Sequence, residues 1–253
     1  MLDQLLPANL FAGLLVFARL GSALMLLPGF GEVYVAPRLR LVLALGLTLL
    51  AAPALASSLP PLPGEPLGLL VLLGGEIGVG IFLGTIARIL LAALQVAGSV
   101  VSIQLGLSAA LIFNPMAQQQ EAITSAFYSV AGVLVIFLAD LHHPMLRGLV
   151  ASYGLFHPGE LIPWGDASDA VARAVTECFR IGVEIAAPFL VIGTVFYAAV
   201  GLVSRLAPQL QILFVVQPLQ IVAGLVAFAL LLTSGLQWFV ERFAADLVRL
   251  TGG

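Results

Sequence analysis

Three charged side chains interrupt stretches of sequence that are otherwise apolar: Arg19, Glu76 and Arg88. Ionisable groups in such surroundings pair with one another, or they carry protons, ions or solutes across a membrane. Glu76 and Arg88 lie about 18 Å apart if they share one helix, so they cannot pair directly. We expect each to pair across a protein interface, with transport chemistry as the alternative. Arg19, close to a predicted helix end, can pair in the same way or extend to the membrane surface.

A second set of candidate residues surrounds a proline that follows an apolar stretch. Asp140, His142 and His143 precede Pro144, and His157 follows further on. Adjacent histidines point in different directions on a helix, and neither an HExxH motif nor a cysteine ligand accompanies them. We therefore expect no metal site. The single Cys178 excludes an intramolecular disulfide.

Catalytic motifs are missing from the chain. The sequence has no GxSxG elbow and no serine with an evident His and Asp pair. An intramembrane hydrolase, which would need paired Asp, HExxH or a Ser-His arrangement, finds no support. The sequence therefore predicts a protein that is not an enzyme.

Five glycines cluster around Glu76, with spacings that put small residues on one helix face: Gly74, Gly75, Gly78, Gly80 and Gly84. Such a face lets another helix approach closely in lipid. The segment from Gly78 to Gly84 reads GxGxxxG, which differs from the dinucleotide fingerprint and lacks its strand and turn. We expect helix packing here, and no cofactor.

The composition shows which classes of protein can carry these residues. Of 253 residues, 61% are hydrophobic and 9% charged, the net charge is −3 and the mean hydropathy is +1.13. Soluble domains contain about 25% charged residues, so a soluble enzyme is excluded. All ten basic residues are arginine and none forms a basic run, so we expect no nucleic-acid partner.

Because about 20 apolar residues cross a bilayer as a helix, the apolar stretches predict an all-α polytopic membrane protein. A positively charged segment of a signal peptide is missing, so we expect the N-terminus to remain in the mature protein. The stretch beginning at Leu67 is too long for one crossing and must turn back or continue outside the bilayer. Charged residues from Asp169 to Glu184 alternate in sign along one helix face, either facing solvent or facing a partner. Six candidate spans lie near Leu10–Leu27, Leu41–Ala56, Leu67–Ile112, Ala122–Ala139, Ile185–Ser204 and Leu219–Val240.

Two breaks in the apolar pattern carry glutamines, one after Asn114-Pro115 and one around Pro208 and Pro218. Non-helical backbone at membrane depth is tolerated where protein or a watery cavity satisfies it, so the breaks indicate surface loops or a lined passage. Uncharged amides suit the passage of an extended polypeptide, whereas an ion pathway favours acidic groups. This pattern favours protein transport over ion transport.

The chain resembles the FliR family of type III export-gate proteins, with its SpaR and YscT relatives, over nearly its whole length. The resemblance rests on Arg19 with the PGFG run from Pro28, on the GEIGVG run from Gly75, on the Asn114-Pro115 break, and on the run from Gly201 to Gln209. His142-His143 before an apolar helix also resembles the family pattern. Asn114 stands where many members have Asp.

The resemblance implies a subunit of a helical complex with FliP-like and FliQ-like proteins, next to FlhB-like and FlhA-like proteins, in the bacterial inner membrane. It implies passive gating of a channel for unfolded flagellar or virulence substrates, without cofactor or catalysis. Residues 1–184 would be FliP-like, and 185–253 a FliQ-like helical hairpin. A secondary transporter of small solutes or ions is the alternative function.

The resemblance also assigns residues to two roles. The segment from about 106 to 121 would be a plug that closes the resting channel, with Gly106, Leu107, Phe113, Asn114, Pro115, Met116, Gln118, Gln119 and Gln120. Helix packing or subunit contacts would involve Gly75, Glu76, Gly78, Gly80, Gly84, Arg88, Arg205, Pro208 and Gln209.

Overall fold

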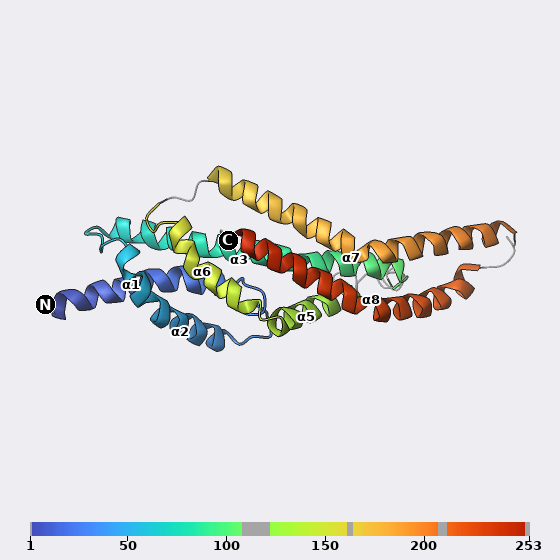
Figure 1. The fold of residues 1–253 in the computed structure, drawn as a ribbon, viewed down its shortest axis with the longest axis horizontal. Coiled ribbons are helices and arrows are strands. Elements are labelled where there is room, and N and C mark those ends of the chain that lie inside the picture. The colour runs from blue at the N-terminus through green and yellow to red at the C-terminus, as the bar shows by residue number, and fades with distance from the viewer. Residues whose placement is uncertain (1, 108–121, 161–163, 207–211, 251–253) are drawn as a thin grey trace. The chain divides into compact units, whose positions relative to one another are not determined.

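The computed structural model describes residues 2–107, 122–160, 164–206 and 212–250, and all regular structure in these ranges is helical (Figure 1). This confirms the all-α prediction. The elements are α1 (Leu2–Leu24), α2 (Pro37–Leu55), η1 (Ala56–Ser58), α3 (Pro66–Gln104), α5 (Ile123–Leu138), α6 (His142–Leu155), α7 (Trp164–Leu206) and α8 (Ile212–Leu250).

The described residues contain four helices long and apolar enough to cross a membrane: α2, α3, α7 and α8. The bent pair α5 and α6 adds a fifth crossing if it is counted as one span. Six spans were expected from the sequence. Among the described residues, Leu10–Leu24 of α1 counts as a shorter apolar helix, and α5 reaches membrane length only together with α6.

Helix α3 is one uninterrupted helix of 39 residues, so the chain does not turn back between Pro66 and Gln104. Its length is about 58 Å, which exceeds the roughly 30 Å hydrocarbon core of a bilayer. Of the two predicted outcomes, continuation outside the bilayer therefore fits this helix. The polar residues in its second half serve helix packing: Ser99 and Ser125 share a hydrogen bond of 3.0 Å, and Thr124 donates to the carbonyl of Gly98 at 2.6 Å.

Helices α7 and α8 merge segments that the sequence analysis kept apart. The charged stripe and the fifth apolar stretch form the single helix α7, and Pro218, expected in a break, lies inside α8. Proline is tolerated in membrane helices because neighbouring groups can satisfy the freed backbone. Within this stripe, Arg180 pairs along its own helix with Glu177 at 2.8 Å and with Glu184 at 4.0 Å.

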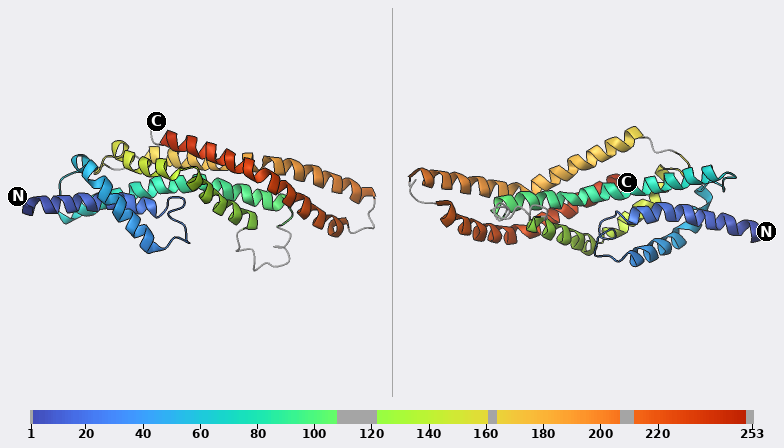
Figure 2. Two further views of the ribbon diagram at one scale, coloured as in Figure 1. Left: turned by 60° about the horizontal axis from the view of Figure 1, so that its bottom comes forward. Right: turned by 180° about the vertical axis from the view of Figure 1, so that it is seen from behind.

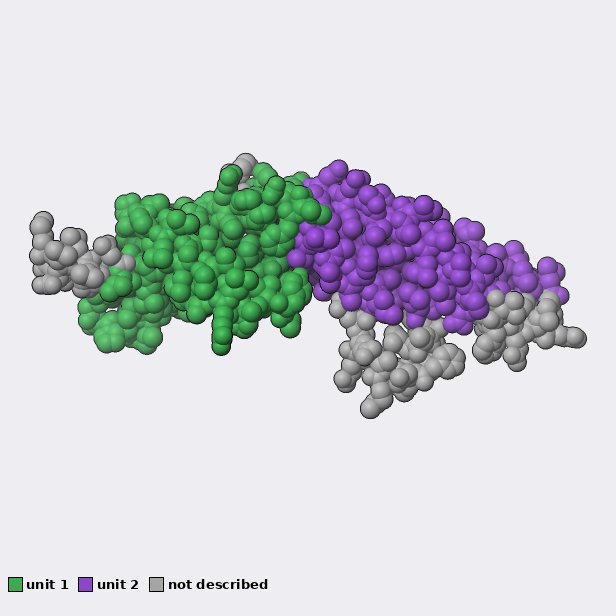
Figure 3. Space-filling model, turned by 90° about the horizontal axis from the view of Figure 1, so that it is seen from below, with its two compact units in different colours: residues 1–90, 136–175, 244–253 green, residues 91–135, 176–243 purple. Residues whose placement is uncertain are grey.

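The chain forms two compact units, each built from segments distant in sequence (Figure 3). Unit 1 contains residues 1–90, 136–175 and 244–253, and unit 2 contains residues 91–135 and 176–243. In unit 1, α1 and α2 lie side by side, as both views in Figure 2 show. These units are defined by contacts within the folded chain. The predicted division at residue 184 concerns likeness to other subunits, and it stays a prediction.

In unit 2, the second part of α7 and the facing part of α8 form an antiparallel hairpin. Trp238 donates from Nε1 to Glu184 at 2.9 Å, the Phe189 and Phe228 rings lie 6.3 Å apart, and Gln220 donates to the hydroxyl of Tyr197 at 2.9 Å. Residues later in α7 therefore contact residues earlier in α8, so the two helices run antiparallel.

Candidate functional site

The ionisable residues of α1 and α3 meet in a buried ion pair inside unit 1. Arg19 Nε donates to Glu76 Oε2 at 2.7 Å, and Arg19 Nη2 donates to Glu76 Oε1 at 2.9 Å. The exposed fraction is 0% for the Arg19 side chain and 2% for that of Glu76. Glu76, which we expected to pair across a protein interface, therefore pairs with Arg19 of the same chain, and Arg19 does not extend to a membrane surface.

Helix α6 completes the surroundings of the Arg19 guanidinium. Nη1 donates to Ser152 Oγ at 3.2 Å, and Nη2 donates to the carbonyl of Phe156 at 2.9 Å. The guanidinium carbon lies 3.8 Å from the centroid of the Tyr153 ring, which is cation–π contact. Every guanidinium nitrogen thus has an acceptor, as a buried charge requires. This network links α1, α3 and α6.

Glycines on α3 bring its backbone against α1 beside this ion pair. A Cβ atom on Gly80 would fall on the carbonyl oxygen of Arg19 and the hydroxyl of Ser22. One turn further, a Cβ atom on Gly84 would lie 2.9 Å from the carbonyl oxygen of Ala23. The two helices can therefore pack this closely only because these positions lack side chains.

The other residues assigned to packing lie differently. Arg88 is exposed and, among the residues whose structure is described, has no ion-pair partner; Arg205 is also exposed. Gly78 is half-buried, and a Cβ atom on half-buried Gly75 would meet nothing within 4 Å. Pro208 and Gln209 lie outside the described residues. The assignment of these positions to subunit contacts stays a prediction.

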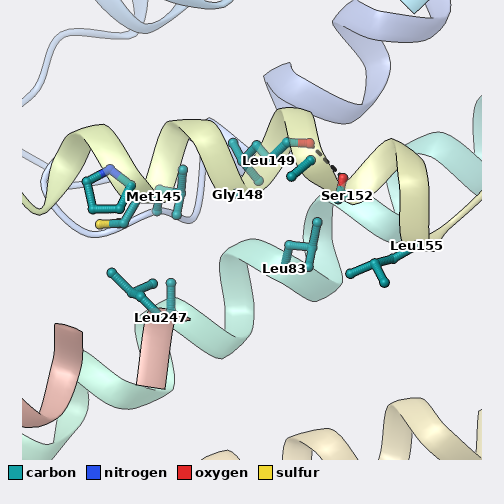
Figure 4. A pocket seen from close by; sticks show the side chains of 11 residues that line it. Leu83, Met145, Gly148, Leu149, Ser152, Leu155 and Leu247 are labelled. Atoms are coloured by element: carbon teal, nitrogen blue, oxygen red, sulfur yellow. Dashed lines mark hydrogen bonds between the residues drawn. The ribbon is translucent and has the colours of Figure 1, made fainter. Parts of the chain in front are cut away.

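A small apolar cavity of about 50 Å³ lies next to the network in unit 1 (Figure 4). Ser152 contributes a polar group to its wall and donates to the carbonyl of Leu149 at 2.6 Å. Leu83 of α3 and Leu247 of α8 line the open space from two other helices, and Leu155 lines it from the end of α6. Because one water needs at least about 10–15 Å³, the cavity has room for a few waters.

The start of the predicted plug segment is anchored in unit 2. Gly106 has a φ of +73°, which favours glycine, and its Cβ position would lie 3.2 Å from the Gln220 side chain. Gln220 also donates from Nε2 to the carbonyl of Gln104 at 2.9 Å. Leu107 is half-buried. The remaining plug residues, Phe113, Asn114, Pro115, Met116, Gln118, Gln119 and Gln120, lie outside the described residues.

Sequence reasoning missed several residues of these networks. Ser152 and Tyr153 carry no motif, and their role depends on the path of α6 beside α1. Trp238 stacks on Arg242, with 4.5 Å from the guanidinium carbon to the ring centroid. Gln220 is recognisable in the sequence as a polar residue among apolar neighbours, but this pattern does not reveal its partners, the Gln104 carbonyl and the Tyr197 hydroxyl.

Helices of membrane length with outward apolar faces define a polytopic helical membrane protein. Within its apolar window, only 6% of α8 and 17% of α2 are buried inside the chain. Residues 10–245 match the family model described as bacterial export proteins, family 1. The chain therefore belongs to this family.

Relatives in three bacteria support the assignment. The chain is 33% identical to the flagellar biosynthetic protein FliR of Caulobacter vibrioides over 93% of this chain and 94% of that protein. It is 30% identical to the FliR protein of Bacillus subtilis over 85% of this chain and 83% of that protein. It is 25% identical to the Yop proteins translocation protein T of Yersinia pestis, over 87% and 85% of the two chains.

Proposed function

We propose that this protein is a membrane subunit of a type III protein export gate, as the names of its FliR and Yop translocation relatives suggest. The single observation that carries the proposal is the family match, which covers residues 10–245. The protein would help to form and gate the channel through which unfolded substrates cross the bacterial inner membrane. It would act without catalysis or a cofactor.

The partners in this proposal are FliP-like, FliQ-like, FlhB-like and FlhA-like proteins. The outward apolar faces of α2, α7 and α8 support such contacts, because helices in an assembly bury apolar surface against one another as well as against lipid. Residues 185–253 would serve as the FliQ-like part, and the antiparallel α7–α8 hairpin is compatible with this role. Exposed Arg88 and Arg205 would contact other subunits.

The geometry weighs against the alternative, a small-solute or ion transporter. Transporters often carry ionisable groups near the bilayer midplane that water or substrate can reach. Glu76 is 2% exposed, and both its carboxylate oxygens accept hydrogen bonds from Arg19. This arrangement suits a structural ion pair.

Co-purification tests the proposed assembly. The tagged chain is expressed with the FliP-like and FliQ-like proteins of the same organism, and we expect the three to form one complex that remains intact in mild detergent. Recovery of the tagged chain alone, although all three proteins are present in the membrane, would contradict the proposal.

Shortening the segment from Gly106 to Glu121 tests the plug. If this segment closes the resting channel, its loss should make cells leak ions while the complex still assembles. When eight residues are removed from the plug segment, a matched control deletes the eight residues from Ser57 to Gly64, which lie in the connection between α2 and α3 that contains η1. A tight membrane and normal secretion in the plug variant would remove the plug assignment but leave the assembly proposal intact.

A further inference from the structure

Asp140, His142 and His143 converge where α5 gives way to α6. One possible ligand atom from each residue lies within 4.8 Å of the others. The two imidazole rings are 4.1 Å apart between centroids and are tilted by 39°. Asp140 Oδ1 lies 3.7 Å from His143 Nδ1. The cluster therefore contains two imidazoles and one carboxylate, although the sequence alone predicted diverging histidines.

The backbone at the end of α5 explains the convergence. Asp140 N–H donates to the carbonyl of Phe137 at 3.2 Å, and Leu141 N–H donates to that of Ile136 at 3.0 Å. These two bonds form a Schellman motif, whose left-handed residue is Asp140 with a φ of 56°. The chain bends by 78° here, and His142 is the first residue of α6. Because of this bend, both histidines lie beside the left-handed residue Asp140, which carries the carboxylate.

Asp140 occupies a position that glycine fills more easily. A left-handed conformation costs an L-residue about 1–2 kcal/mol, and aspartate is among the few residues that adopt it. The Asp140 side chain is 78% exposed and that of His143 is 60% exposed, so both can rotate toward a shared ligand. His142 is held more firmly, because its ring lies 4.9 Å from that of Phe137.

His142 has unused coordinating capacity. Its Nδ1 is buried and has no hydrogen-bond partner among the described residues. A buried polar atom without a partner costs about 1–3 kcal/mol, and a bond to a metal ion would remove that cost. Two imidazole nitrogens and a carboxylate oxygen form a ligand set that suits Zn²⁺ with a water in the fourth position.

We propose that Asp140, His142 and His143 bind a Zn²⁺-class transition-metal ion that fixes the bend between α5 and α6. Zn²⁺ bonds of about 2.0–2.2 Å place tetrahedral ligand atoms about 3.4 Å apart. The ligand atoms, now within 4.8 Å of one another, must therefore approach by at most about 1.4 Å. Rotation of the exposed Asp140 and His143 side chains supplies this movement.

Zinc titration of the full chain tests the site. The protein is purified in detergent with a tag that lacks histidine, stripped with EDTA and titrated with Zn²⁺, and Co²⁺ absorption then reports the coordination geometry. We expect one Zn²⁺ per chain. Losing a second-shell partner weakens metal binding roughly 10–100-fold, so His143→Ala and Asp140→Ala, which each lose a ligand, should weaken it at least as much.

His157→Ala is the matched control. His157 Nδ1 lies 3.8 Å from Glu160 Oε2, with the same i,i+3 spacing and similar exposure but outside the cluster. The zinc affinity of the His157→Ala variant should equal that of the wild type. Circular dichroism of each variant checks that the helices persist. Three results would each overturn the proposal: a wild-type chain without bound Zn²⁺, unchanged binding in His143→Ala, or an equal loss in His157→Ala.

Discussion

Arg19 and Glu76 lie 57 residues apart in the sequence, and two nitrogens of the Arg19 guanidinium contact both carboxylate oxygens of Glu76. Removing one partner of a buried pair leaves the other charge unpaired, which costs about 3–5 kcal/mol. Arg19→Met should therefore lower the free energy of unfolding in detergent by about that amount.

Two further variants separate charge from packing at this pair. Combining Arg19→Met with Glu76→Met removes both charges, and most of the stability should return because apolar replacement of a buried pair is often neutral. Arg88→Met, at an exposed arginine on α3, should change little. If Arg19→Met is no less stable than Arg88→Met, the ion pair does not hold these helices together.

Gly80 tests the close approach of α1 and α3. Gly80→Ala places a Cβ atom against the Arg19 carbonyl and should destabilise the chain by about 1–3 kcal/mol. Gly74→Ala, on the same helix with nothing within 4 Å of its Cβ position, should be neutral or stabilising by up to about 1 kcal/mol. Thermal unfolding in detergent compares the two. Equal midpoints would show that the helices are not in close contact at Gly80.

The sequence was sufficient to predict the helical class, because 61% hydrophobic residues with few charges leave only membrane helices as a solution. It also indicated that Glu76 is paired and that Gly80 and Gly84 serve helix packing. The partner of Glu76 was not predictable, because no spacing rule relates residues of two different helices. The clustering of Asp140 with His142 was missed because it depends on the left-handed backbone at the end of α5.

Gln220 tests the anchor beside Gly106. Gln220→Leu removes the donor shared by the Gln104 carbonyl and the Tyr197 hydroxyl. A hydrogen bond contributes about 0.5–1.5 kcal/mol net, so we expect the variant to lose about 1–3 kcal/mol of stability. Gln237→Leu, at an exposed glutamine of the same helix, is the control. A larger loss in the control than in Gln220→Leu would contradict the anchor.

Arg88 separates folding from assembly. Because its side chain is exposed, Arg88→Glu should leave the free energy of unfolding of the isolated chain within about 0.5 kcal/mol of the wild type. The charge reversal should nevertheless reduce recovery of the FliP-like and FliQ-like proteins with the tagged chain. Unchanged recovery would show that Arg88 does not contact another subunit.

Secretion by cells that lack this protein tests the central claim most directly. The amount of type III substrate in the medium is measured for the deletion strain, for the same strain carrying the wild-type gene, and for the parent. We predict that the deletion abolishes export while the substrates still accumulate inside the cell, and that the wild-type gene restores export. Normal export by the deletion strain would contradict the assignment of this protein to the export gate.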